Sequence, residues 1–184
     1  GLINEYCNEA DAIYEGKPIK VMPLEGSEKL VIEGESFEAF NTSGGCATMC
    51  ETYANKVENL TYKTIRYPGH LNHMKFLFND LHLKKNKDIL EKLFDKEVPR
   101  TKNDVIIFFV KVIGLIDGVL QEKTYLRKIY GNDKFSAIQL TTASGACSVL
   151  KMHLDGKISN KGFIRQESLS WNDFIDNKFG NIYK

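Results

Sequence analysis

The sequence predicts an α+β fold in which helices pack on a mixed, largely antiparallel sheet, all within one domain that spans residues 1–184. Short runs of β-prone residues are separated by glycine-containing turns, as in hairpins and meanders. Helical segments are inserted among these runs without the regular strand–helix–strand alternation that a parallel sheet requires. A chain of 184 residues is also long enough to bury one hydrophobic core.

The first half of the chain contains two predicted hairpins, a further strand and three helices. The apolar residues of 70–81 recur at the spacing of an amphipathic helix. Neither face of the predicted strand 60–67 is cleanly polar, so we expect it to be covered on both sides. The predicted elements are hairpins within 11–26 and 29–40, a helix over 46–55, the strand over 60–67, and helices over 70–81 and 86–97.

The second half is predicted to begin with a long hairpin over 104–130 that turns at Asp117-Gly118. The first strand of this hairpin is apolar on both faces, so we expect it to lie in the centre of the sheet. The remaining predicted elements are a strand over 135–140, a break at 141–145, a helix over 146–156, an extended segment over 161–169 and a terminal helix over 170–180 that Ser170 caps.

Composition and charge exclude some classes of partner. Apolar residues make up 42% of the chain and charged residues 27%, which is ordinary for a soluble globular protein. The net charge of +1 and the pI near 7.8 give no electrostatic reason to expect nucleic acid or an anionic membrane as a partner. The sequence shows no apolar run of membrane-spanning length and no signal peptide. We therefore expect a cytoplasmic protein.

The four cysteines are Cys7, Cys46, Cys50 and Cys147. Their spacing is neither that of a zinc site nor that of a disulfide framework. Cys46 and Cys50 are four residues apart, which places them on one face of the predicted helix. We expect reduced thiols that pack as small apolar side chains, and we expect no metal.

Three places share one local design, in which a strand runs through small or hydroxyl-bearing residues into a predicted helix. Helix N-termini carry free N–H groups and the positive end of the helix dipole, so they bind anions readily. Ser and Thr are good N-caps whatever the function, so simple capping is the alternative. Three such stretches in one domain favour recognition of a small carboxylate-bearing molecule. The stretches are "EAFNTSGGCATM" (38–49), "TIRYPGHLNHM" (64–74) and "IQLTTASGACSV" (138–149).

Arg66 has two interpretations. It is either an ordinary surface residue at a strand end or a bidentate partner for a substrate carboxylate beside a helix N-terminus. His70 and His73 are candidates for an acid–base or metal pair, but no acidic partner is placed by the sequence, so solvent-facing histidines are the simpler expectation. Cys46 near a helix N-terminus would have a lowered thiol pKa, although a packed cysteine is again simpler.

Three stretches, "EAFNTSGGCATM", "YKTIRYPGH" and "FSAIQLTTASGA", resemble the C-terminal domain of the saccharopine dehydrogenase family in sequence, order and spacing. The resemblance runs from "GLINEY" nearly to the end of the chain. The third stretch is looser, because relatives often carry a TTG-type loop where this chain has the segment 141–145. No G-x-G-x-x-G fingerprint or Walker loop is present to hold a nucleotide.

The resemblance implies that residues 1–184 are the substrate-binding and dimerisation half of an NAD(P)-dependent oxidoreductase, and that its N-terminal Rossmann domain is absent from this chain. The family oxidises the C–N bond of a secondary amine such as saccharopine. NAD or NADP is expected in the intact protein and neither on this fragment, which alone is expected to be inactive. The expected partners are a saccharopine-like amino acid and a second copy of the chain in a homodimer.

By position, the resemblance implies that Arg66 grips a substrate carboxylate and that the segment 41–45 lines the cleft. No residue is assigned as the catalytic acid or base. Asn4 and Glu5 are weaker candidates to approach the cleft. The expected substrate-binding residues are Asn41, Thr42, Ser43, Gly44, Gly45, Arg66, Tyr67, His70, Thr141 and Thr142.

Three alternatives stay open. The first keeps the fold and changes the substrate, as in a carboxynorspermidine or lysine dehydrogenase. The second is a dimerisation module without catalytic activity. The third treats Cys46 and His70 as the nucleophile pair of a hydrolase.

Overall fold

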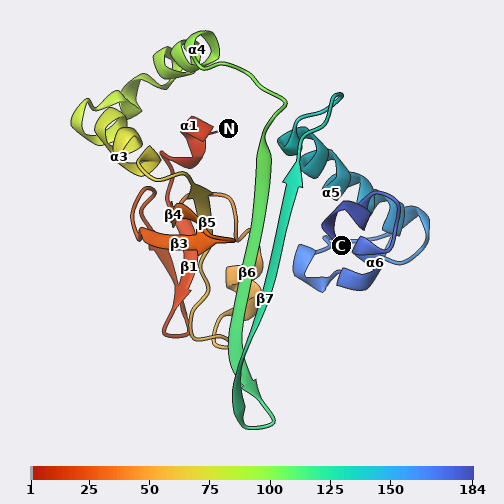
Figure 1. Cartoon of the computed structure of the whole chain (residues 1–184). Helices are drawn as coiled ribbons and strands as arrows, with labels where there is room; N and C mark the ends of the chain where they lie inside the picture. Colours follow the sequence, from red (N-terminus) through yellow and green to blue (C-terminus); the bar gives the residue numbers. More distant parts are fainter. Residues whose placement is uncertain (1) are drawn as a thin grey trace. The chain divides into compact units, whose positions relative to one another are not determined.

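The computed structural model describes residues 2–184, and its backbone contacts divide the chain into two compact units, Gly1–Pro99 and Arg100–Lys184. Figure 1 shows that each unit combines strands with helices, which confirms the α+β class. The strands form three separate antiparallel sheets within the described chain, where a single mixed sheet was predicted. Residues 2–184 contain no helix long and apolar enough to span a membrane.

The first unit contains a two-stranded sheet and a three-stranded sheet. The two predicted hairpins are confirmed, because β1 pairs with β2 and β3 pairs with β4, each antiparallel. The predicted strand 60–67 is shorter than expected, and it adds to the far edge of β4. The strands are β1 (Ala10–Tyr14), β2 (Lys17–Val21), β3 (Glu28–Ile32), β4 (Glu35–Asn41) and β5 (Lys63–Arg66).

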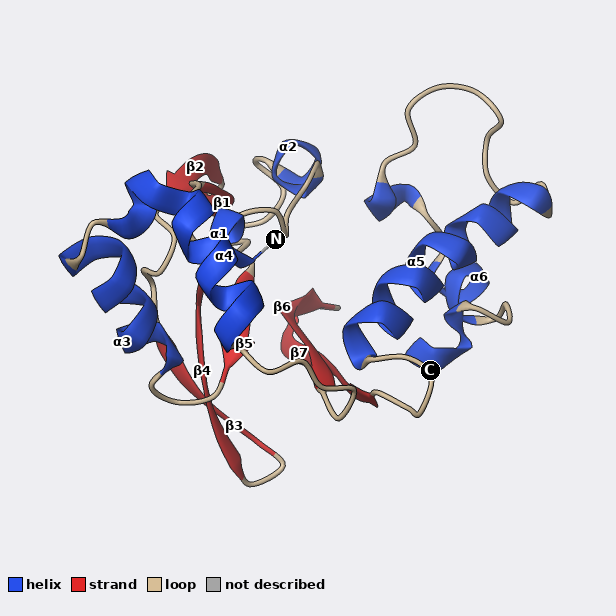
Figure 2. Ribbon diagram, turned by 90° about the horizontal axis from the view of Figure 1, so that it is seen from above, coloured by secondary structure: helices blue, strands red, loops and turns tan. Residues whose placement is uncertain are grey.

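The helices of the first unit gather around one core. Figure 2 shows α1, α3 and α4 grouped on one side of the β3–β4–β5 sheet. Their apolar side chains meet those of β4 in a buried cluster of Ile3, Tyr6, Leu24, Phe40, Leu71, Phe78 and Leu90. The helical segments are α1 (Leu2–Glu5), α2 (Met49–Tyr53), α3 (His70–Lys75), a π-helical turn (Phe76–Asp80), a 3-10 turn (Leu83–Asn86) and α4 (Lys87–Glu97).

The long hairpin of the second unit is confirmed, but its predicted central position is wrong. β6 (Val105–Ile116) and β7 (Val119–Tyr130) pair along their full length and form a sheet of two strands. Asp117 (φ 52°) and Gly118 (φ 77°) both adopt left-handed conformations, as a two-residue hairpin turn requires. The distal half of the hairpin carries apolar residues on both faces and is exposed on both, so it does not lie in the centre of a sheet.

The segment 135–145 departs most from the prediction. A strand and a break were expected, but α5 (Ala137–Leu154) runs through both. Ser136 and Gln139 form a reciprocal capping box, and the Asp104 carboxylate accepts hydrogen bonds from the N–H groups of Ala137 and Ile138. This strong helix start outweighs the β propensity of the two threonines.

The C-terminal elements pack on α5 and on β7. The predicted cap of Ser170 on α6 (Trp171–Ile175) is confirmed. The expected extended segment 161–169 holds no strand, but it contains a 3-10 turn (Gln166–Ser168). Tyr183, in the last 3-10 turn (Gly180–Tyr183), donates to the Thr141 carbonyl at 2.6 Å, and its own carbonyl accepts from the Tyr125 hydroxyl at 2.5 Å.

Candidate functional site

One face of the β4–β5 pair carries the candidate site. Arg66 stands opposite Glu38 in the strand register, and Phe40 stands opposite Thr64. Because side chains two residues apart on a strand share a face, these four side chains lie on the same side of the sheet. Tyr6 packs edge-on against Phe40, with ring centroids 5.8 Å apart, on this face.

Arg66 is held by neutral groups of the protein. Its Nε–H donates to the Tyr6 hydroxyl at 3.1 Å, and its Nη1 donates to the carbonyl of Ile65 at 3.2 Å. Among the described residues no carboxylate forms an ion pair with Arg66. A guanidinium has five N–H groups and these contacts occupy two, so three remain for a ligand. The arrangement can receive a planar anion such as a carboxylate.

His70 completes this cluster, and the expectation of a solvent-facing histidine is wrong for it. Its Nε2 lies 2.9 Å from the Tyr6 hydroxyl, and its ring stacks on Phe40 at 6.3 Å. Burial, and after it the positive charge of Arg66, lowers the pKa of His70 below its ordinary value. His73 is exposed on the same helix, as expected for a solvent-facing histidine.

Glu38 occupies the helix start that was expected to attract a substrate anion. Its Oε1 accepts a 2.7 Å hydrogen bond from the N–H of Leu71, in the first turn of α3. Asp104 fills the start of α5 in the same way. The third helix, α2, begins at Met49, four residues after Gly45, and spans only five residues. The helix start predicted near residue 146 is wrong, because α5 runs through it. Anion binding at the other two helix starts stays a prediction.

The loop 41–45 divides between structural and exposed residues. Asn41 is buried, and its side chain lies against Gly26, where an added Cβ would come within 2.8 Å of Nδ2. The buried Thr42 shares a 2.7 Å hydrogen bond with the hydroxyl of Thr64. Ser43 donates its backbone N–H to the Glu5 carbonyl at 3.1 Å. Thr42 therefore reaches the face of Arg66 through Thr64, whereas the side chain of Asn41 packs against Gly26.

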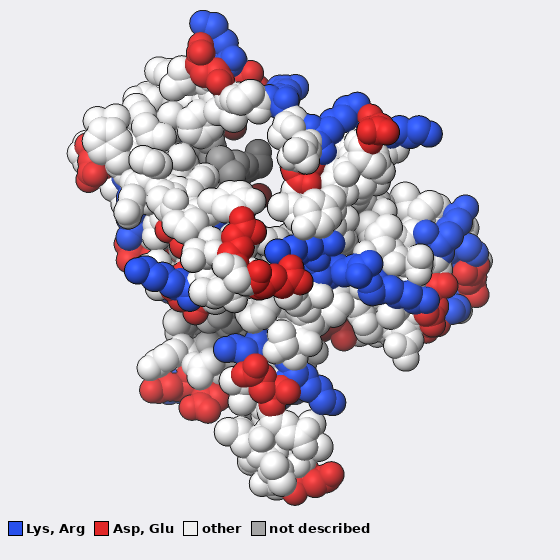
Figure 3. All heavy atoms as spheres, in the orientation of Figure 1, with Lys and Arg blue, Asp and Glu red and all other residues white. Residues whose placement is uncertain are grey.

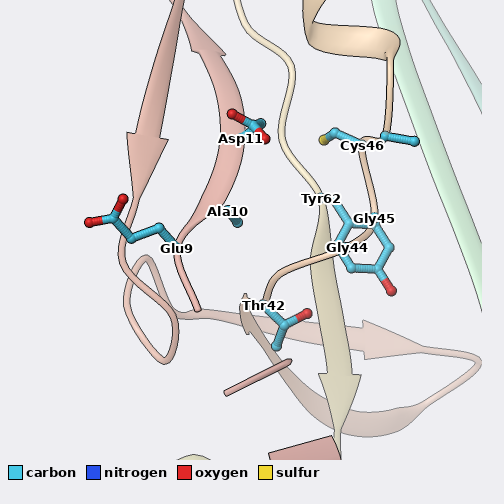
Figure 4. Close-up of a pocket in the computed structure, with 9 residues that line it drawn as sticks. Glu9, Ala10, Asp11, Thr42, Gly44, Gly45, Cys46 and Tyr62 are labelled. Atoms are coloured by element: carbon cyan, nitrogen blue, oxygen red, sulfur yellow. The ribbon is translucent and has the colours of Figure 1, made fainter. Parts of the chain in front are cut away.

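A small pocket of about 120 Å³ opens beside this loop. Figure 4 shows the ring of Tyr62 next to Gly45 and the sulfur of Cys46 directed toward the strand that carries Asp11. Gly45 has to be glycine, because an added Cβ would lie 1.9 Å from the Tyr62 ring. The volume suits roughly four water molecules or one small polar group. The pocket is lined by Glu9, Ala10, Asp11, Thr42, Gly44, Gly45, Cys46, Ala47 and Tyr62.

Three further residues expected to bind substrate do not lie among the side chains around Arg66. Tyr67 is exposed, and it follows Arg66 on the opposite face, where its ring lies 5.4 Å from that of Phe37. Thr141 is buried within α5, and its hydroxyl donates to the Ala137 carbonyl at 2.9 Å. Thr142 is exposed on the same helix. Thr141 therefore has its polar groups committed inside the second unit.

The thiols of Cys46 and Cys50 belong to a buried cluster with Ile13. Burial, with a smaller contribution from Cys50, raises the pKa of the Cys46 thiol to about 12. The suggestion of a lowered pKa is thus wrong. No described contact joins Cys46 to His70, whose Nε2 is hydrogen-bonded to the Tyr6 hydroxyl. All four cysteines are free thiols, and the described residues include no group of three side chains able to hold a metal ion.

Sequence reasoning missed the residues that hold Arg66 and the start of α3. Tyr6 lies 60 residues before Arg66, and Glu38 lies 33 residues before Leu71. Neither pair has a periodic spacing, so no local signal joins them. The only available signal for Tyr6 was its place in "GLINEY", a stretch within the family resemblance.

Fold and site together describe an α+β chain in which three N–H groups of Arg66 have no partner among the described contacts. The chain matches the family model described as the saccharopine dehydrogenase C-terminal domain over residues 1–179. It therefore belongs to the saccharopine dehydrogenase C-terminal domain family, a family of oxidoreductases, as the resemblance predicted.

Proposed function

We propose that this chain is the substrate-binding and dimerisation half of an NAD(P)-dependent, saccharopine dehydrogenase-like oxidoreductase. Its substrate is an amino-acid derivative with a secondary amine, which is oxidised at the C–N bond. Family membership over residues 1–179 supports the class of reaction. The observation that carries the substrate assignment is Arg66, whose guanidinium keeps three N–H groups free and lacks a carboxylate partner among the described residues.

Arg66 would bind a carboxylate of the substrate and so fix the orientation of the neighbouring carbon. A half-buried arginine suits this role, because a charge-assisted hydrogen bond is stronger when water is partly excluded. The groups that accept hydrogen bonds from Arg66 are neutral, and Glu38, which stands opposite Arg66 in the strand register, accepts a hydrogen bond from the N–H of Leu71 instead. No described ion pair therefore occupies the guanidinium of Arg66 before the substrate arrives.

The nicotinamide cofactor supplies hydride acceptance when bound, and the family is typically NAD(P)-dependent. The described residues do not fit a dinucleotide, since every strand pair is antiparallel and no strand leads through a glycine-rich turn into a long helix. We therefore assign NAD or NADP to the intact protein outside residues 2–184. The role of the chain is to bind and orient the amine substrate.

The distal half of the β6–β7 hairpin is the proposed dimerisation surface. Figure 3 shows that this end carries few charged side chains. Leu115 and Leu120 face each other across the strands and are 72% and 70% exposed. An apolar hairpin that is open on both faces is rarely left uncovered in a soluble protein. A second copy of this chain would cover it.

A carboxynorspermidine or lysine dehydrogenase remains the alternative with the same chemistry, because each of these substrates also offers a carboxylate to Arg66. A module without catalytic activity is the alternative from another class. The test is to supply the intact protein with NAD or NADP and with saccharopine, carboxynorspermidine or lysine in turn, and to follow reduction of the cofactor. Reduction with one amine is expected, and no reduction with any of them would support the module.

A further inference from the structure

Tyr6 is buried completely, yet its hydroxyl lies between two functional side chains. It accepts from Arg66 Nε at 3.1 Å and lies 2.9 Å from Nε2 of His70. A guanidinium only donates, so the Tyr6 oxygen is the acceptor in the first contact. Its single proton is then free to be donated to His70 Nε2, and both polar contacts of the hydroxyl are satisfied.

The ring of Tyr6 is fixed on several sides. It packs edge-on against Phe40, His70 and Phe78, with centroids 5.8, 5.8 and 6.2 Å away. Such packing restricts the position of the hydroxyl, and hence that of the Nε–H that it accepts. A long arginine side chain loses much rotamer freedom when it is held in this way. The entropy cost of ordering the Arg66 side chain therefore arises on folding and not on substrate binding.

We propose that Tyr6 is a positioning residue for Arg66, which it orients so that a substrate carboxylate meets the three N–H groups of Nη1 and Nη2 that Tyr6 and the Ile65 carbonyl leave without a partner. The edge formed by Nε and Nη2 is not free, because Tyr6 takes the Nε–H. His70 contributes by accepting a hydrogen bond from the Tyr6 hydroxyl. The lone pairs of the hydroxyl oxygen are then available to accept from Arg66. Tyr6 itself is buried and does not touch the substrate. This inference rests on the proposed role of Arg66 in substrate binding.

Kinetics of the intact protein test the proposal, with the variants Tyr6→Phe, Arg66→Ala and the double variant. Tyr6→Phe keeps the ring and removes the hydroxyl with its hydrogen bonds to Arg66 and His70. Because the bond that orients Arg66 is lost, we expect KM for the amine substrate to rise about 3- to 10-fold. The value of kcat should change by less than about twofold. In the Arg66→Ala background, Tyr6→Phe should have no further effect on KM, because the residue through which it acts is gone.

Tyr53→Phe is the matched control, since it removes a hydroxyl from a half-buried tyrosine that packs on the Cys46–Cys50 cluster of the same unit. Its KM should equal that of the wild type. An unchanged KM in Tyr6→Phe, or an equal rise in both backgrounds, would overturn the positioning role. An unchanged KM in Arg66→Ala would instead remove the proposed function, so the two failures are distinguishable.

A second measurement needs neither activity nor a folded Tyr6 variant. In the intact wild-type protein labelled with ¹⁵N-arginine, the Nε–H of Arg66 should give a signal that exchanges slowly with water, because Tyr6 accepts it inside the fold. The signal is assigned by its loss in Arg66→Lys. A rapidly exchanging Nε–H would contradict the proposed hydrogen bond to Tyr6.

Discussion

The carboxylate of Glu38 and the backbone N–H of Leu71 form a 2.7 Å hydrogen bond that closes the first turn of α3. Glu38 lies on β4, so this contact connects the sheet to the helix and also places a negative charge at the positive end of the helix. The same carboxylate stands opposite Arg66 in the strand register. Through its hydrogen bond to the N–H of Leu71, Glu38 helps to fix the helix that carries His70.

We expect Glu38→Ala to destabilise the protein by about 1 kcal/mol, the usual cost of losing a helix N-cap. For a chain of this size the melting temperature should fall by roughly 2–4 °C. Glu35→Ala, at an exposed position of the same strand, is the control and should leave the melting temperature unchanged. Equal melting temperatures for Glu38→Ala and the control would show that the cap does not contribute to stability.

The lowered pKa of His70 predicts a loss of stability in acid. The folded protein keeps His70 neutral while the unfolded chain titrates near the ordinary value of 6.5, so the unfolded state binds more protons below that pH. The free energy of unfolding is thus highest above pH 6.5 and falls as the pH drops toward the lowered pKa. Thermal melts at pH 7.5 and at pH 5 measure the difference.

His70→Gln should reduce this acid sensitivity, because the titrating group is removed while an acceptor for Tyr6 remains. His73→Gln, which changes an exposed histidine on the same helix, should retain it. If both variants lose stability in acid as much as the wild type does, the acid sensitivity has another origin.

The raised pKa of Cys46 predicts slow alkylation. The thiolate is the reactive form, and at a pKa of about 12 very little of it is present at neutral pH. In the native protein, iodoacetamide should therefore modify the half-buried Cys7 and Cys147 before Cys46 and Cys50, as followed by mass spectrometry of tryptic peptides. Fast alkylation of Cys46 together with loss of an esterase or peptidase activity would revive the hydrolase alternative.

The exposed hairpin predicts that Leu120→Glu prevents dimerisation of the chain. The charge would be placed next to Leu115 on the proposed surface, where burial without a partner is costly. Sedimentation equilibrium should show a dimer for the wild type and a monomer for the variant. Val31→Glu, at a 73% exposed position of β3, is the matched control and should stay dimeric. A wild type that is monomeric at tens of micromolar would refute the proposed surface.

The parts of the fold that the sequence predicted correctly are those with local signals. The hairpin turn at Asp117-Gly118, the amphipathic segment after Gly69 and the cap at Ser170 each depend on neighbouring residues. The error at 135–145 arose because the capping signal of Ser136 and Gln139 was overlooked in favour of the β propensity of Thr141 and its neighbours.

The candidate site was predictable only in part. Arg66 drew attention by its place before Pro68-Gly69, and the structure places it at the end of β5, four residues before the start of α3. Its role in binding a carboxylate stays a prediction. The partners that decide how it is held, Tyr6 above all, come from a distant part of the chain. Glu38 shows the same limit, because a carboxylate on a strand gives no sign in the sequence that it will cap a helix.

Arg66→Ala in the intact protein, assayed with the amine substrate and NAD or NADP, tests the central claim most directly. A charge-assisted contact is worth about 1.5–3 kcal/mol, so kcat/KM should fall about ten- to a hundredfold, mostly through KM. Arg66→Lys, which keeps the charge without the paired N–H groups, should lie between the variant and the wild type. The melting temperature should change little, because no carboxylate is left unpaired. A well-folded Arg66→Ala protein with unchanged kcat/KM would show that Arg66 does not bind the substrate.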